Sequence, residues 1–269
     1  MATIALQAAA TGLSALNTKL DVIANNLANV NTTGFKGSRT NFQDLLYIER
    51  SQPGSENANG DRSPTGLFVG LGVKVSGTQT DMRQGDVINT QRDLDVLIDG
   101  IGFFKVKVED SLGNGTAYTR AGNFILNKDG ELCLATNQGR RIQPIITIPS
   151  DVVGPVKITS DGKIQYLQPG QTQPTEAGPI QLTAFVNPAG LKPIGENLFQ
   201  ETAASGPPLE GDPGTENRGR LQQGALEGSN VDPTGELIEM IRTQRAFEMN
   251  SNVIRAADET LRTVSQLNR

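Results

Sequence analysis

The fold is decided by the stretch LQAAATGLSALNTKLDVIANNLANV, residues 6–30. Apolar side chains recur in it at spacings that alternate between three and four residues: Leu6, Ala9, Leu13, Leu16, Leu20, Ile23, Leu27 and Val30. A spacing that averages about 3.5 residues over several turns is typical of a coiled-coil seam. Asn29, Asn31 and Gly34 follow and indicate a helix end. The pattern predicts an N-terminal helix that packs along one narrow stripe.

A second helix is predicted at the other end of the chain. Asp232 and Pro233 form an N-cap followed by a proline in the first helical position. No Pro or Gly occurs from Glu236 to Arg269. Apolar residues recur there every seven positions or lie beside that row: Leu237, Met240, Phe247, Ile254, Ala257, Leu261 and Val264.

Between the two helices the apolar period changes from seven to two. Asp99-Gly100, Asp129-Gly130 and Asp161-Gly162 each lie between alternating apolar runs. Asp-Gly in this setting predicts a tight hairpin, because the turn needs positive φ angles. We therefore expect three hairpins in an antiparallel β domain that spans roughly residues 80 to 225. The predicted fold class is α+β, with paired terminal helices flanking a β-rich middle domain.

Four segments follow from these patterns. We expect an N-terminal helix in residues 1–36, an extended or β arm in 37–80, a β-rich domain in 81–228 and a C-terminal helix in 229–269. Residues 50–66, within the arm, show no hydrophobic period and read as a linker or an interaction arm.

A lone helix with one narrow apolar stripe is marginally stable and needs a partner on that face. Three arrangements satisfy this requirement. The two helices can pair within one molecule and cap the β domain, they can join copies into a polymer, or they can form a small defined oligomer.

Composition excludes several classes of function. The 269 residues carry 24 Lys and Arg against 29 Asp and Glu, a net charge of −5, with no His and one Cys. An acidic chain lacks the basic surface that captures nucleic acid or anionic lipid. One Cys and no His exclude an internal disulfide and Cys-rich zinc sites, and remove the commonest general base. No apolar run is long enough to span a membrane, and no cleavable secretory signal begins the sequence.

Candidate chemistry is sparse. Asp93, Asp95 and Asp99 resemble the start of a calcium loop, but the turn glycine and the closing Glu are missing. Cys133 alternates with Leu132 and Leu134, which is typical of a buried strand position. We predict no catalytic, cofactor or metal site. A β-rich hydrolase that uses two carboxylates stays open as the alternative, because such a pair meets only in the fold.

Several blocks of the sequence resemble bacterial flagellar rod and hook proteins. The blocks are LSALNTKLDVIANNLANVNTTGFKGSRTNFQDLL, LDVLIDGIGFFKV, AYTRAGNFILNKDGELC and LQQGALEGSNVDPTGELIEMIRTQRAFEMNSNVIRAADE. The run from Ala24 to Lys36 is the most specific part, and the blocks follow the expected order over nearly the whole chain.

Within that family the chain is most similar to the members that form the distal part of the rod. The resemblance rests on DLLYIERSQPGSENANGDRSPTGLFVGLGV, and residues 46–66 discriminate these members from proximal rod and hook-type proteins, which are the alternatives. The residues that stand for this rod-specific insertion are Leu46, Tyr47, Ile48, Pro53, Pro64 and Gly66.

The resemblance implies a structural role. Copies of the chain would form a helical tube that transmits torque from motor to hook and encloses the export channel. The implied partners are other copies, proximal rod and hook proteins, the basal-body bushing rings and the type III export apparatus. The implied place is the rod that crosses the periplasm and the outer membrane. The predicted subunit interface comprises Leu6, Leu13, Leu16, Leu20, Ile23, Leu27, Val30, Leu237, Met240, Phe247, Ile254, Leu261 and Val264.

Overall fold

The computed structural model describes residues 2–54, 64–112, 115–149, 151–152, 154–171 and 173–267. These residues form two compact units. Unit 1 contains the two chain ends and Ser38–Thr80, and unit 2 contains Asn29–Gly37 and Asp81–Val231. Two helices and a β-rich middle with antiparallel pairing confirm the predicted α+β class.

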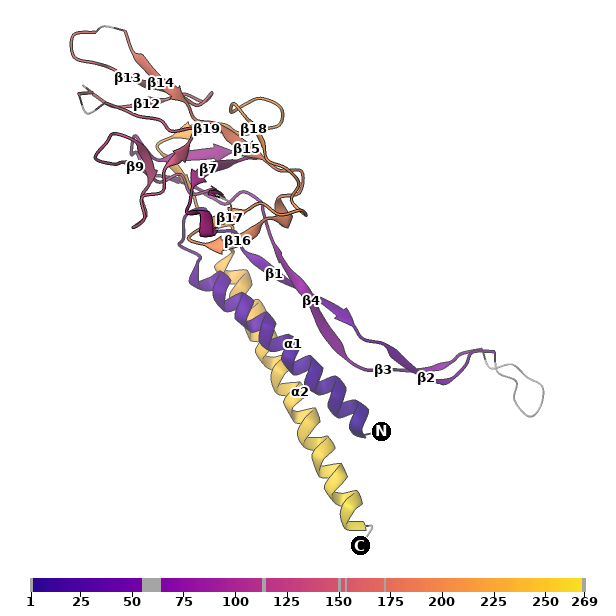
Figure 1. Cartoon of the computed structure of the whole chain (residues 1–269). Helices are drawn as coiled ribbons and strands as arrows, with labels where there is room; N and C mark the ends of the chain where they lie inside the picture. Colours follow the sequence, from indigo (N-terminus) through magenta and orange to yellow (C-terminus); the bar gives the residue numbers. More distant parts are fainter. Residues whose placement is uncertain are drawn as a thin grey trace. The chain divides into compact units, whose positions relative to one another are not determined.

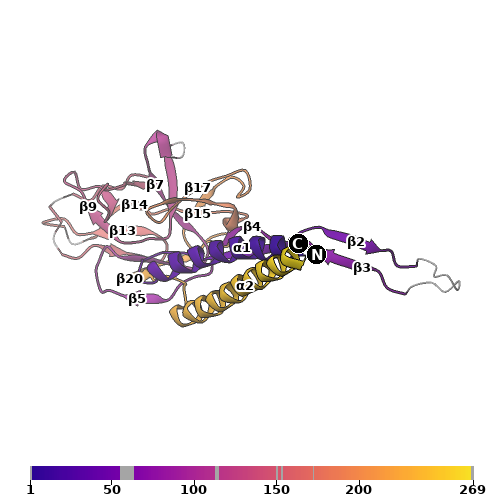
Figure 2. The same cartoon turned by 90° about the horizontal axis from the view of Figure 1, so that it is seen from below.

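Unit 1 is built on two long helices, α1 (Ala2–Ala28) and α2 (Pro233–Leu267), which lie side by side (Figures 1 and 2). The predicted N-cap of α2 is present, because the Thr234 amide donates to Asp232 Oδ1 at 3.0 Å. Helix α1 ends at Ala28, and Asn29 accepts a turn bond from the Thr32 amide. The helix therefore ends before the last residue of the apolar row, and Val30 lies past the helix end.

The arm is an antiparallel ribbon in two sections. Strand β1 (Ser38–Asp44) pairs with β4 (Val73–Thr80), and β2 (Tyr47–Ser51) pairs with β3 (Leu67–Gly70). Figure 1 shows β2 and β3 continuing the line of β1 and β4. Residues 55–63, which belong to the predicted insertion, lie outside the described residues.

Close packing fixes this ribbon on α1. Gly72 has a φ of +121°, and a Cβ there would lie 2.1 Å from Thr11 Oγ1. Thr11 Oγ1 also accepts a bond of 3.4 Å from the Val73 amide. The glycine thus allows the strand to reach the helix surface.

Unit 2 contains short strands that pair in antiparallel fashion throughout the described residues. They are β5 (Val87–Asn89), β6 (Val96–Asp99), β7 (Phe103–Lys107), β8 (Thr116–Thr119), β9 (Phe124–Leu126), β10 (Leu132–Leu134), β11 (Ile142–Gln143), β12 (Lys157–Ile158), β13 (Lys163–Tyr166), β14 (Thr175–Pro179), β15 (Leu182–Ala184), β16 (Lys192–Gly195), β17 (Leu198–Gln200), β18 (Leu209–Gly211), β19 (Arg220–Gln223) and β20 (Ala225–Glu227). Two 3₁₀ turns, η1 (Asp110–Leu112) and η2 (Pro188–Gly190), complete the described elements.

The largest sheet runs β16-β17-β8-β7-β15-β18, with β11 also beside β7. Strand β7 separates two apolar cores, because successive side chains point to opposite faces of a strand. Phe104 belongs to the larger core and meets Phe124 edge-on at 5.0 Å. Phe103 belongs to the smaller core, which also holds Tyr118 and Phe185. The alternation predicted for this strand is therefore confirmed.

Two of the three predicted hairpins are confirmed. Strand β9 pairs with β10 around Asp129-Gly130, and β12 pairs with β13 around Asp161-Gly162. The hairpin predicted at Asp99-Gly100 is wrong, because β6 pairs with β19 while β7 pairs with β8 and β15.

The glycine at this failed hairpin serves a different purpose. A Cβ on Gly100 would lie 3.0 Å from Gly219 Cα, so Gly100 lets another segment pass closely. Gly102 then adopts a φ of +144° as the chain moves from one sheet to the next. Asp-Gly signals backbone freedom, and here that freedom is used for a crossing and not for a turn.

Candidate assembly surfaces

Polar contacts set the register of the helix pair in unit 1. Asn26 is buried in α1, donates to Glu236 Oε1 at 3.0 Å and to the Ser38 carbonyl at 2.8 Å, and accepts a bond from the Ser38 amide at 2.9 Å. Lys19 forms an ion pair of 2.8 Å with Glu239, and this contact lowers the pKa of the Glu239 carboxyl. One asparagine therefore ties both helices to strand β1.

The predicted interface residues differ in how far one copy of the chain buries them. The fully buried positions of α1 include Ala9, Gly12 and Ile23, whereas its leucines stay half-buried. On α2, Met240, Phe247 and Ile254 are half-buried, while Leu237 and Leu261 are exposed. The side chain of Val264 lies outside the described residues. One copy of the chain thus leaves part of both apolar rows accessible.

A recess opens between the two helices. It has a volume of about 200 Å³ and is lined by Asn17, Leu20, Gln244, Phe247 and Glu248. Its apolar floor consists of Leu20 and Phe247, two of the predicted interface residues. The recess has room for a side chain from another molecule.

Helix α2 carries apolar side chains that stay about half exposed or more within one copy. These are Leu237, Ile238, Ile241, Met249 and Val253, with Met249 63% exposed. Monomeric proteins rarely leave so many apolar side chains together on one element, and such surfaces mark sites of association.

The ribbon β2–β3 exposes apolar side chains on both of its faces. Tyr47 lies opposite Gly70 and shares a face with Phe68, while Ile48 lies opposite Val69 on the other face. Tyr47 and Phe68 are each more than half exposed, and Leu46 is 82% exposed. A two-stranded ribbon is marginally stable by itself, so this one needs contacts on both faces.

The remaining insertion residues lie at the end of that ribbon farthest from β1 and β4, after Ser51 of β2 and before Leu67 of β3. Pro53 and Pro64 are exposed, and Gly66 is half-buried. A Cβ on Gly66 would lie 2.8 Å from the Ser51 carbonyl oxygen and 2.9 Å from Pro53 Cδ. Gly66 therefore lets the two strands of the ribbon close on each other.

Unit 2 holds a buried ion cluster of Lys36, Arg120 and Glu227. The Lys36 ammonium contacts Glu227 Oε1 directly, and Arg120 Nη1 lies 3.4 Å from Glu227 Oε2. The side chains of Lys36 and Glu227 are at most 1% exposed. Burial lowers the pKa of Lys36, and the Glu227 charge opposes that shift. The Arg120 guanidinium also lies 5.3 Å from the centre of the Phe103 ring.

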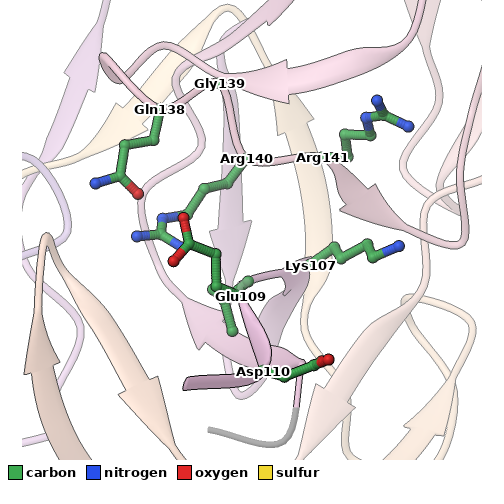
Figure 3. Close-up of a pocket in the computed structure, with 8 residues that line it drawn as sticks. Lys107, Glu109, Asp110, Gln138, Gly139, Arg140 and Arg141 are labelled. Carbon is green, nitrogen blue, oxygen red and sulfur yellow. The ribbon is translucent and has the colours of Figure 1, made fainter. Parts of the chain in front are cut away.

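An open depression in unit 2 is lined by Lys107, Val108, Glu109, Asp110 and residues 138–141, with a volume of about 720 Å³ (Figure 3). Figure 3 shows Gln138 and Arg140 on one side of it and Lys107 and Arg141 on the other. Arg140 pairs with Glu196 at 2.9 Å and Arg141 with Glu131 at 3.1 Å. Arg140 and Arg141 are thus paired with neighbouring carboxylates.

The residues that the sequence offered as candidates for chemistry do not form a common site. Asp95 is buried and accepts a bond of 2.6 Å from Thr90, and Asp99 ends β6. Cys133 is buried in β10, and burial raises the pKa of its thiol. Within the described ranges, no cluster of three His, Cys, Asp or Glu could hold a metal ion. No described helix is long and apolar enough to cross a membrane.

Sequence reasoning missed the buried polar residues Asn26, Lys36, Arg120 and Glu227. The one available signal is Glu227 itself, which follows Ala225 and Leu226 in a short apolar strand. Its partners are up to 191 positions away in the sequence, so pattern alone could not pair them.

Comparison with known proteins places these surfaces in context. Residues 6–36 match the family described as flagella basal body rod protein, residues 97–166 the flagellar hook protein FlgE/F/G D1 domain, and residues 222–267 the flagellar basal body rod FlgEFG protein C-terminal. The flagellar basal-body rod protein FlgG of Buchnera aphidicola (subsp. Baizongia pistaciae) is 46% identical over 263 residues, which cover 98% of this chain and 99% of the relative.

The chain belongs to the flagellar basal-body rod proteins.

Other relatives agree. FlgG of Agrobacterium fabrum is 44% identical over 97% of this chain and 98% of its own, and FlgG of Bacillus subtilis is 40% identical over 96% of both. This rod protein is a structural subunit of the distal rod in the flagellar basal body, and it assembles with other flagellar axial proteins. The prediction that it is not an enzyme is confirmed, and the hydrolase alternative has no support.

Proposed function

We propose that this rod subunit polymerises through α1 and α2 into a helical tube that carries torque from motor to hook around an open export channel. Supporting this, α2 leaves Leu237, Ile238, Ile241, Met249 and Val253 exposed within one copy. A contact that repeats head to tail without closing generates a helical filament. Helices packed across subunits resist shear, because packed interiors have few alternative arrangements.

The interface in this proposal consists of the predicted residues of both helices. The recess floored by Leu20 and Phe247 would receive a side chain of a neighbouring copy. The half-buried leucines of α1 would become fully buried there, each contributing about 1 kcal/mol or more from the additional burial.

The ribbon β2–β3 has a distinct role in the proposal. It would wedge between neighbouring subunits and suppress the bending that a hook allows. The apolar side chains on both of its faces support this placement, because a ribbon held on one side only would leave Tyr47 or Ile48 in water.

The finer location and partners belong to the same proposal. The rod would cross the periplasm and the outer membrane inside the bushing rings, and the subunit would leave the cytoplasm through the flagellar type III export apparatus.

Limited proteolysis tests the proposal. In dilute solution α1, α2 and residues 38–80 should be cleaved while unit 2, residues 29–37 and 81–231, resists, and raising the concentration towards assembly should protect the helices as well. Fragment masses give the cleavage sites. A dilute chain that resists cleavage from end to end would mean that the helices are satisfied within one molecule, and the polymer proposal would fail.

A further inference from the structure

The nine residues Asn29–Gly37, here called the strap, follow α1 directly but belong to unit 2. Backbone bonds hold the strap there at several points. The Gly34 amide donates to the Glu227 carbonyl at 2.8 Å, and the Asp81 amide donates to the Gly37 carbonyl at 2.8 Å. Asn197 Nδ2 donates to the Thr33 carbonyl at 2.9 Å. The strap is therefore hydrogen-bonded along its length to three segments of unit 2.

The side chain of Lys36 seats the strap in the buried ion cluster. Its ammonium donates to the Glu227 carboxylate and, at 2.6 Å, to the Arg83 carbonyl. Glu227 also accepts a bond of 2.9 Å from the Gly85 amide. Removing one member of such a buried pair leaves an uncompensated charge, which is strongly destabilising. Release of the strap would separate these charges and expose the cluster, so release costs free energy.

Asn230 closes the arrangement from the other end of the chain. Its Nδ2 donates to the carbonyls of Asp81 at 2.8 Å and Arg83 at 3.1 Å, and its Oδ1 accepts a bond of 2.8 Å from the Gly37 amide. One side chain thus joins three of the four places where the backbone enters or leaves unit 2, those next to residues 37, 81 and 231.

We infer that the strap is an anchor already formed in the free subunit, held by Glu227 and Asn230, from which α1 folds when copies assemble. The inference rests on the proposed function in one respect, namely that the helices fold when copies assemble. A helix whose last turn adjoins a fixed segment starts from a restrained end, which reduces the cost of its nucleation.

Trypsin offers a direct test, because it cuts after Lys and Arg. Lys36 lies between Lys19 and Arg39, and Arg39 is exposed. In dilute wild-type protein the bond after Lys36 should be cut at least about a hundredfold more slowly than the bond after Arg39, since cleavage requires the cluster to open. Equal cleavage after Lys36 and Arg39 would overturn the inference.

Asn230→Ala removes the three hydrogen bonds of the Asn230 side chain and should accelerate cleavage after Lys36 by about tenfold or more, relative to cleavage after Arg39. Asn187→Ala is the matched control. Asn187 makes one surface bond of 3.1 Å to the Ala204 carbonyl in unit 2, and its loss should leave cleavage after Lys36 unchanged. An Asn230→Ala variant that is cut after Lys36 as slowly as the control would also overturn the inference.

A fold check accompanies the variant. Lys105 lies in β7, and the bond after it should stay intact in Asn230→Ala. If it is cut, Asn230→Asp replaces Asn230→Ala in the test, because it keeps the side-chain shape and the acceptor oxygen for the Gly37 amide and removes the two donated bonds. Failure of the proposed function is visible separately. In that case Lys19 resists trypsin in dilute protein, while the comparison of Lys36 between variants still stands.

Discussion

At the scale of single residues, Gly130 shows how local backbone and packing combine. It turns the β9–β10 hairpin with a φ of +77°, and a Cβ there would lie 2.2 Å from the Ile148 carbonyl oxygen. Gly170 has a similar φ of +86°, but no atom lies within 4 Å of its Cβ position. The two glycines share the same backbone demand and differ only in the space around them.

This difference predicts unequal costs for the same substitution. Gly170→Ala should lower the free energy of unfolding of unit 2 by about 1 kcal/mol, from backbone strain alone. Gly130→Ala should lower it by about 3 kcal/mol or more, because the backbone must also move away from Ile148. Urea denaturation followed by circular dichroism gives both values. Equal losses would mean that Gly130 does not pack closely against the Ile148 carbonyl.

Tyr118 links burial to alkaline stability. Burial raises the pKa of its phenol to about 12, against an ordinary value of 10. The folded state then holds a proton that the unfolded state releases above pH 10, so stability is full below pH 10 and falls as pH rises from 10 to 12. The loss should reach about 2 kcal/mol.

Tyr118→Phe tests that sign. The variant has no phenol to titrate, so its melting temperature should fall less steeply between pH 10 and pH 12 than that of the wild type. Thermal unfolding monitored by circular dichroism at several pH values gives the two slopes. Identical slopes would contradict the assignment of the alkaline loss to Tyr118.

At the scale of secondary structure, the signals that succeeded were local. The seven-residue rows predicted both helices, and Asp232 with Pro233 predicted where α2 begins. Alternation predicted the two faces of β7. The hairpin at Asp99-Gly100 failed because strand pairing is decided by distant segments, here β19 and β15, which no local pattern names.

The helix pair gives the next prediction. Leu20→Asp or Ile254→Asp should abolish polymerisation, because either change places an unpaired charge in an apolar seam. Unit 2 should keep its melting transition. Polymer is measured by sedimentation, and unit 2 by circular dichroism.

Matched controls separate the seam from added charge. Ser14→Asp on α1 and Asn252→Asp on α2 put the same charge at exposed positions, and both should polymerise more readily than the seam variants. If Leu20→Asp or Ile254→Asp unfolds unit 2 as well, the helices and the β domain are not separable modules.

At the scale of the whole molecule, the sequence predicted the function better than the detailed surfaces. Family blocks such as residues 24–36 are contiguous and can be recognised in one dimension. The buried cluster of Lys36, Arg120 and Glu227 joins three distant segments, so only the fold reveals it. The insertion is intermediate, because its lack of an apolar period set it apart in the sequence but did not indicate the paired strands β2 and β3.

The ribbon supplies a prediction for the assembled rod. Deleting residues 46–66 should allow assembly but give a more flexible tube, measured as a shorter persistence length in electron micrographs. Replacing Tyr47, Ile48 and Phe68 together by Ser keeps the length of the ribbon and removes its apolar contacts, so it should have a similar effect. An equally stiff rod after the deletion would remove the ribbon from the account of stiffness.

A helical reconstruction by electron cryomicroscopy of tubes assembled from the purified chain tests the proposed polymer most directly. We expect α1 and α2 to form the inner wall, unit 2 to lie outside, and the β2–β3 ribbon to insert between neighbouring copies. A chain that stays monomeric on concentration, or tubes joined through unit 2 with α1 and α2 facing solvent, would contradict assembly through the helices.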